Sequence, residues 1–153
     1  MPVFSATRRV AAAPAVTFAV ASEVAAYKDF LPLLERSSIL GPLTEIDGIT
    51  TFNAELAVGY AKLNVRETFI SRVTCNAANR TVIATSQQPP FRDMKTTWTI
   101  REVAGDSDVS ISIEYAMRST LLQFAVSAAM EMAVQKVMSA FETRALAVAQ
   151  LKA

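Results

Sequence analysis

Side chains that could perform covalent or acid–base chemistry are scarce in this sequence. Histidine, the commonest general base and metal ligand, is absent, and Cys75 is the single cysteine. Triads that need histidine and zinc sites made of cysteine and histidine are therefore excluded. The carboxylates of Asp29, Glu35, Glu45 and Asp47 fall in or beside expected loops, where they form no recognisable acid pair. This inventory argues against catalysis.

The cysteine and the charge balance restrict the compartment and the partners. One cysteine cannot form an internal disulfide, which fits a reducing compartment, and we expect Cys75 to be an inert small apolar side chain. A cytoplasmic protein is therefore predicted. The net charge is +1 and no stripe of basic residues with interleaved aromatic residues is present, so DNA binding is not expected.

The composition is unusually apolar for a chain of 153 residues. Apolar residues make up 52% and charged residues 19%, against about 45–50% and about 25% in ordinary globular proteins. The length corresponds to one domain, so residues 1–153 are predicted to form a single domain. The excess apolar surface could line a cavity, face a partner or touch a membrane.

The order of the expected elements predicts an α+β domain. Residues 2–10 alternate as a first strand, a helix follows from Pro14 through 15–24, and a second short helix covers 27–30. Between 37 and 118 the period changes to two and indicates about six further strands. Breaks between them are expected at Gly41-Pro42, Asp47-Gly48, 76–79, Pro89-Pro90 and 105–108. One-sided alternation predicts a curved antiparallel sheet with one covered face.

A long helix at 119–151 is expected to cover the sheet. The segment contains neither glycine nor proline and is rich in strong helix formers. Its predicted inner stripe consists of Leu122, Val126, Ala129, Met130, Ala133, Val137, Ala140 and Phe141. Phe124, Val134 and Met138 are expected on the outer side, where they could contact a membrane or form a dimer interface.

Five segments carry a further pattern: YKDFLP at 27–32, ETFISRV at 67–73, QPPFRDMKTTW at 88–98, EYAMRSTLL at 114–122 and AFETRA at 140–145. In this order they resemble motifs of the coenzyme Q-binding protein family. The family forms are Y-P-x-F-L-P-W, F-x-S-R-V, G-P-F-x-x-L-x-x-x-W-x-F, y-x-F-r-S-x-L-L and A-F-E-x-R-A. This chain departs from them with Lys28 in place of proline, Leu33 in place of tryptophan and Pro89 in place of glycine.

The resemblance covers about residues 3–147 and implies a fold and a ligand. The fold is the helix-grip fold of START-like and birch-pollen-allergen-like domains, with a curved antiparallel sheet of about seven strands, two short helices and a long C-terminal helix. The family is described as binding ubiquinone (coenzyme Q), an isoprenoid quinone, and as supporting respiration as a chaperone and not as an enzyme. Ubiquinone is therefore the expected ligand, with no catalytic cofactor and no metal.

Two alternative functions stay open at this point. Some bacterial relatives are called ribosome-association toxins, although the near-neutral charge gives no support for contact with ribosomal RNA. The wider START-like and polyketide cyclase superfamily also hosts cyclases and aromatases, because one fold can carry many activities. The lack of histidine and of a clustered acid–base set argues against that second alternative.

Candidate ligand contacts lie on the covered face of the sheet, on the inner helix stripe and at the expected entrance. They are Leu31, Pro32, Glu67, Phe69, Phe91, Met94, Trp98, Tyr115, Met117, Leu122, Met130, Val137 and Phe141. The methionines suit a cavity for a flexible tail, but plain core packing explains any one of these residues equally well. Because Val137 is placed in the middle of the stripe, aspartate there is expected to unfold or empty the domain.

Glu67 shares strand parity with Val65, Phe69 and Val73, so its carboxylate is predicted on the covered face. A carboxylate in that position must be paired or hydrated. It could bind a ligand headgroup at the mouth of a cavity, or form an ion pair with a neighbouring lysine or arginine.

The apolar segment Leu31–Leu34 would lie in a loop at the cavity entrance. Four apolar residues in a loop suggest a lid or a contact with the inner membrane, which would make the protein peripheral to that membrane. The alternative is that they plug the end of the sheet.

Overall fold

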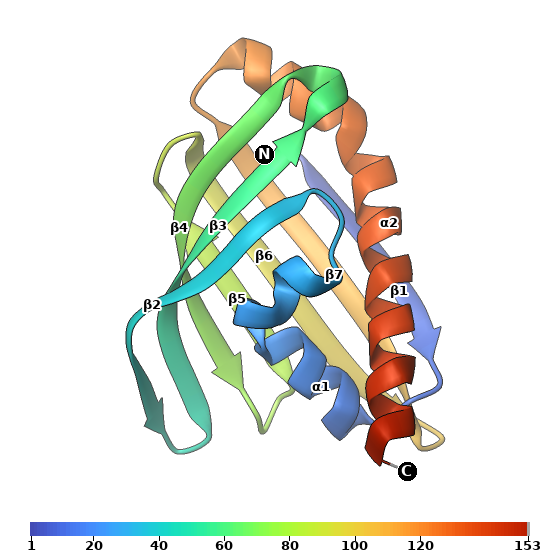
Figure 1. Ribbon diagram of the computed structural model, residues 1–153. Coiled ribbons are helices and arrows are strands. Elements are labelled where there is room, and N and C mark those ends of the chain that lie inside the picture. Colours follow the sequence, from blue (N-terminus) through green and yellow to red (C-terminus); the bar gives the residue numbers. More distant parts are fainter. Residues whose placement is uncertain (153) are drawn as a thin grey trace.

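The computed structural model describes residues 1–152, which form a seven-stranded antiparallel sheet curved around one long helix (Figure 1). The strands are β1 (Val3–Val10), β2 (Leu34–Ile46), β3 (Ile49–Tyr60), β4 (Val65–Asn76), β5 (Thr81–Ser86), β6 (Phe91–Val103) and β7 (Asp106–Met117). The helices are α1 (Pro14–Ser22), the 3₁₀ helices η1 (Val24–Asp29) and η2 (Ala61–Leu63), and α2 (Thr120–Lys152). The spatial order β1-β7-β6-β5-β4-β3-β2 leaves β1 and β2 as the two edges.

The predicted α+β architecture is confirmed, with three local differences. The helix that begins at Pro14 ends at Ser22, and the second short helix begins earlier than expected, at Val24. Gly41-Pro42 is no turn: it lies inside β2, where the pairing with β3 shifts between Leu40 and Thr44. Gly41 has a φ of 72° there, a conformation that glycine adopts without a steric penalty and that suits an irregularity within a strand.

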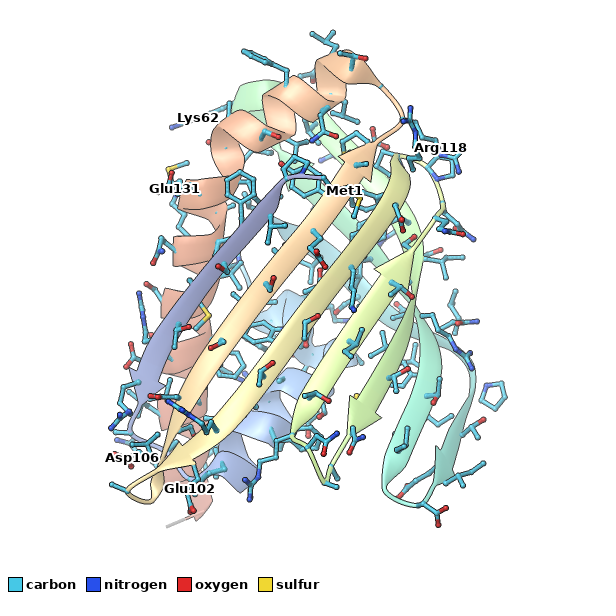
Figure 2. The ribbon with its side chains drawn as sticks, turned by 180° about the vertical axis from the view of Figure 1, so that it is seen from behind. Met1, Lys62, Glu102, Asp106, Arg118 and Glu131 are labelled. Carbon is cyan, nitrogen blue, oxygen red and sulfur yellow. The ribbon has the colours of Figure 1, made fainter. Side chains whose placement is uncertain are left out.

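The two faces of the sheet differ as the alternation predicts. On β7 the buried residues Val109, Ile111, Tyr115 and Met117 share one parity, because successive side chains of a strand point to opposite faces. The outer face carries short polar and charged side chains, seen from behind in Figure 2. The inner face therefore supplies the core and everything that the sheet contributes to a binding site.

The buried side of α2 differs from the predicted stripe. Val134, Met138 and Phe141 are 2%, 1% and 0% exposed, whereas Phe124 is 77% exposed. The prediction that Val134 and Met138 lie on the outer side is therefore wrong, and Val137 lies only half-buried at the edge of the packed face. Apolar residues and alanines occur all round this helix, so the 3.6-residue period alone did not identify the side that packs against the sheet.

A row of charges crosses three strands on the outer face of the sheet. Asp108 accepts hydrogen bonds from Arg9 Nε at 2.6 Å and from Arg101 Nη2 at 2.9 Å. The two guanidinium groups lower the pKa of the Asp108 carboxyl. Arg9 on β1 and Arg101 on β6 are both direct cross-strand neighbours of Asp108 on β7, so the three residues tie one edge strand into the sheet.

Asp108→Asn should lower the free energy of unfolding at pH 7 and leave it unchanged in strong acid. The folded-state pKa of Asp108 is lowered, so its contribution is present above the unfolded pKa, about 3.9, and is lost as the pH falls through the folded value. Urea unfolding of both proteins from pH 7 to pH 2 measures this difference. An equal difference at every pH would show that ionisation of Asp108 contributes nothing.

Candidate ligand-binding cavity

A cavity of about 270 Å³ lies between the inner face of the sheet and α2. Its walls are almost entirely apolar, and its lining side chains come from β3 to β7, the β5–β6 loop, α2 and η1. The lining residues are Val24, Tyr27, Leu56, Val58, Val65, Glu67, Phe69, Ser71, Val73, Val82, Ala84, Pro90, Phe91, Met94, Thr96, Trp98, Ile113, Tyr115, Met117, Val126 and Met130. Ligand sites in proteins have volumes of about 300–1,000 Å³, so this cavity is small for a ligand site.

Most of the predicted contact residues meet in this cavity. They are Glu67, Phe69, Phe91, Met94, Trp98, Tyr115, Met117 and Met130. Strand parity places all of these except Phe91 and Met130 on the covered face of β4, β6 or β7. Phe91 has the opposite parity to Met94 and Trp98, and it lines the cavity because the pairing of β6 with β7 shifts between Phe91 and Asp93.

The other predicted contacts lie outside the cavity lining. Phe141 is fully buried behind Trp98, with ring centroids 4.7 Å apart and planes inclined by 26°, so it supports the cavity wall. Leu31 and Val137 pack partly buried against the main core, and Leu122 packs against the cluster around Tyr115. Pro32 is half-buried but does not line the cavity.

Several lining residues were not predicted although the sequence contained a signal for them. Ser71 and Val73 share the parity of Glu67, and Leu56 and Val58 share the parity of the buried Phe52. By contrast, Val24 and Tyr27 of η1 reach the cavity only because that short helix packs beside the sheet, which no local pattern indicates.

The two tyrosines of the lining already have hydrogen-bond partners. The Tyr115 hydroxyl lies 2.7 Å from Ser127 Oγ on α2, and the Tyr27 hydroxyl donates to the carbonyl oxygen of Ala21. Burial raises the pKa of both phenols. Both side chains therefore stay neutral near pH 7; Tyr115 links α2 to the sheet, and Tyr27 links η1 to α1.

Glu67 lies on the covered face, as predicted, and lines the cavity. The ion pairs of the described residues are Arg8–Glu142, Arg9–Asp108, Arg66–Glu35 and Arg101–Asp108. None of these involves Glu67, so the alternative of an ion pair with a neighbouring lysine or arginine finds no support there. The next residue, Arg66, has the opposite strand parity and binds Glu35 through two hydrogen bonds of 3.2 and 3.1 Å.

Between α2 and the connected ends of β3 and β4 the cavity adjoins a second hollow, and we call this side its mouth. The second hollow has a volume of about 150 Å³ and is lined by Leu33, Val58, Gly59, Tyr60, Val65, Val126, Ala129, Met130 and Ala133. It shares Val58, Val65, Val126 and Met130 with the main cavity. The two hollows are therefore adjacent, and Leu33 is the residue of the predicted entrance loop that reaches the mouth.

The rest of that loop is half-buried. Leu31 and Leu34 are half-buried against the main core, and β2 already begins at Leu34. Both side chains therefore contribute to the packing of the main core.

Cys75 is buried on the inner side of the sheet, and burial raises the pKa of its thiol. A buried thiol with a raised pKa is a poor nucleophile, because the thiolate is the reactive form. Cys75 is part of the main core together with Phe52 and Val82.

Comparison with known proteins places the chain in a family. Residues 10–142 match the family described as polyketide cyclase / dehydrase and lipid transport. The chain belongs to this family. It is 33% identical over 122 residues to the mitochondrial coenzyme Q-binding protein coq10 of Schizosaccharomyces pombe, a match that covers 77% of this chain and 71% of that protein. The resemblance to coenzyme Q-binding proteins is thereby confirmed.

Solved structures agree on the fold. An 18 kDa protein of Caulobacter crescentus superposes with a TM-score of 0.80 at 26% identity, covering 95% of this chain and 96% of the other. The Zhui aromatase/cyclase of Streptomyces sp. R1128 superposes with a TM-score of 0.79 at 19% identity, covering 94% and 93% of the two chains. The second likeness shows the fold alone, because the same fold carries unrelated activities. Within residues 1–152, no helix is long and apolar enough to cross a membrane.

Proposed function

We propose that this protein is a non-catalytic binding protein for an isoprenoid quinone, ubiquinone, which it holds in the cavity between the sheet and α2 and supplies to respiratory electron transport as a chaperone. The observation that carries the proposal is the cavity of about 270 Å³ with its apolar walls and its adjacent opening. The similarity to a coenzyme Q-binding protein supports the choice of ligand class.

The size of the cavity indicates how such a ligand would be held. About 270 Å³ suits one ring and a short piece of chain, so most of a long isoprenoid tail would lie outside. Each methylene removed from water contributes about 0.8 kcal/mol. Affinity should therefore rise with the first isoprene unit or two and then level off.

Extraction of the purified protein with organic solvent, followed by mass spectrometry, tests the proposal directly. A quinone should be recovered, and added short-tail ubiquinone should quench the fluorescence of Trp98, the single tryptophan, which lines the cavity. A protein that carries no quinone and binds none when it is added would refute the proposal.

A non-catalytic role fits the side chains around the cavity better than a cyclase role does. Glu67 is the only carboxylate in the lining, the two tyrosines have other partners, and the chain has no histidine. No observation specifically favours the cyclase or the ribosome-linked alternative. An unchanged ribosome profile in a sucrose gradient with added protein would agree with the quinone proposal.

We also propose that the protein is cytoplasmic and contacts the inner membrane peripherally, through the start of α2 more than through Leu31–Leu34. Leu121 and Phe124 are 80% and 77% exposed, and residues 119–130 contain no charged side chain. This surface lies on the helix that borders the cavity mouth, where α2 contributes Val126 and Met130. A ligand that is nearly insoluble in water could pass there directly into lipid.

The charges around this end favour an anionic bilayer. Lys62 and Arg118 lie at the end of the molecule where α2 begins, Glu131 lies further along α2, and Glu102 and Asp106 lie at the opposite end (Figure 2). The exposed apolar residues of the β2–β3 hairpin are a rival surface, since Leu43 and Ile46 are 55% and 65% exposed. That hairpin is acidic, because residues 37–61 contain glutamate and aspartate but neither lysine nor arginine.

Leu121→Glu/Phe124→Glu should abolish most binding to vesicles that contain an anionic phospholipid while leaving the protein folded. Burying two such side chains at a lipid interface contributes about 1.5–3 kcal/mol each, so affinity should fall by at least about tenfold. Vesicle sedimentation measures binding, and transfer of quinone between vesicles should slow in parallel. The matched control is Leu43→Glu/Ile46→Glu, which adds the same charge to the rival hairpin. Lost binding in the control and normal binding in the first variant would move the contact to that hairpin.

A further inference from the structure

Ser71 has a hydroxyl group that the protein itself does not use. The residue is 1% exposed and lines the cavity, and Oγ has no hydrogen-bond partner among the described residues. The neighbouring Ser86 is different, since its hydroxyl donates to the carbonyl oxygen of Ile70 at 2.6 Å. A buried hydroxyl without a partner is rare in folded proteins and needs an explanation, such as a ligand that supplies the missing partner.

The position of Ser71 is suited to contact with a ligand. It lies on the inner face of β4 between Phe69 and Val73, and its direct neighbour on β3 is the small, fully buried Ala54. Ala84, which lines the cavity on β5, pairs with Val73 and so lies diagonally across from Ser71. The small side chain of Ala84 borders the cavity there, and Thr96, the β6 partner of Ala84, adds a second hydroxyl to this part of the lining.

The Thr96 hydroxyl is also weakly engaged. Its partner is the sulfur atom of Met94 at 3.3 Å, and thioether sulfur is a weak acceptor. Each of the two hydroxyls, which lie two strands apart, can therefore donate to a different atom of a ligand in the cavity.

The charge of the lining restricts the ligand further. Glu67 lies four residues from Ser71 on the same face of β4, about 13 Å towards the mouth. The lining contains neither lysine nor arginine. An anionic headgroup would meet a carboxylate and no counter-charge in an apolar space, which is unfavourable. An uncharged headgroup with hydrogen-bond acceptors has no such penalty.

We infer that the cavity binds an uncharged lipid with its headgroup inward, a carbonyl oxygen of that headgroup accepting a hydrogen bond from Ser71. The ring lies over Ala84 and Thr96, and the tail passes Glu67 and leaves between α2 and the ends of β3 and β4. A 1,4-quinone fits this description, so the inference rests on the proposed function. It adds the orientation of the ligand and the residues that distinguish a quinone from other lipids.

Ser71→Ala tests the hydrogen bond. The affinities of two ligands of equal tail length are measured. One is a short-tail 1,4-quinone, and the other is the corresponding alkylbenzene, which has no carbonyl group. One net hydrogen bond corresponds to an affinity change of about 3- to 10-fold. Ser71→Ala should weaken quinone binding by that factor, leave alkylbenzene binding unchanged and keep the melting temperature. Ser86→Ala, the matched control, should lower the melting temperature and keep the ratio of the two affinities.

The outcomes separate this inference from the proposed function. If the unmodified protein binds the quinone and Ser71→Ala does not change the ratio of the two affinities, the role of Ser71 is refuted and the quinone proposal stands. If the unmodified protein binds no quinone, both fail. The orientation has its own measurement. A ring held inward should quench Trp98 at saturation. Binding in equilibrium dialysis without quenching would refute the inward ring.

Glu67→Gln tests the selection against anionic lipids. The variant should bind a fatty-acid anion of matched tail length at least about tenfold better than the unmodified protein, because the like charge is removed. Its affinity for the quinone should change little. Equal affinities of both proteins for the fatty acid would refute the role of Glu67.

Discussion

Met138→Asp should abolish cooperative folding at room temperature or lower the melting temperature by about 10 °C or more. Met138 is 1% exposed on the side of α2 that faces the sheet, in contact with the main core. Removing a buried methionine side chain costs about 2–5 kcal/mol, and an unpaired carboxylate in the same place adds its own desolvation cost. The total is a large share of the 5–15 kcal/mol that typically stabilises a domain.

Two control substitutions on the same helix show whether the loss of stability depends on the burial of the substituted position. Phe124→Asp, at a position 77% exposed, should change the free energy of unfolding by no more than about 0.5 kcal/mol. Val137→Asp, at a half-buried position, should fall between the two, although the sequence alone placed Val137 at the centre of the packed stripe. Thermal and urea unfolding followed by circular dichroism measure all three. A Met138→Asp protein that melts like the unmodified protein would contradict the described packing of α2.

Ala84→Phe should remove ligand binding while the domain stays folded. Ala84 lines the cavity on the inner face of β5, so a phenyl group attached there would occupy the space that we assign to the ligand ring. In a fully packed core such an enlargement costs about 1–3 kcal/mol, but here an existing cavity can take the ring. We expect the affinity for a short-tail quinone to fall by at least about tenfold, with little change in melting temperature.

Thr85→Phe is the matched control for this filling of the cavity. Thr85 is exposed on the opposite face of the same strand, so the same ring there should leave the cavity empty and the affinity unchanged. Quenching of Trp98 and equilibrium dialysis should agree in both variants. Unchanged quinone binding by a folded Ala84→Phe protein would show that the quinone binds elsewhere on the molecule.

The strands and the long helix could be predicted from the sequence because their signals are local. Alternation with period two assigns Glu67, Phe69 and Tyr115 to the covered face, and this assignment needs only the parity of each strand. The lack of glycine and proline after residue 119 likewise predicts the length of α2. Five motifs in order then indicated the family, which the comparisons confirm.

The packed side of α2 and the cavity were decided by tertiary structure. Val134 and Met138 are buried because the sheet meets α2 on that side, and a helix with apolar residues all round gives no local sign of which side this is. Phe141 was assigned to the ligand but packs behind Trp98, since whether an inward side chain borders empty space depends on its neighbours from other strands. Ser71 differs from Ser86 for the same reason: whether a buried hydroxyl has a partner depends on atoms that only the folded chain brings near.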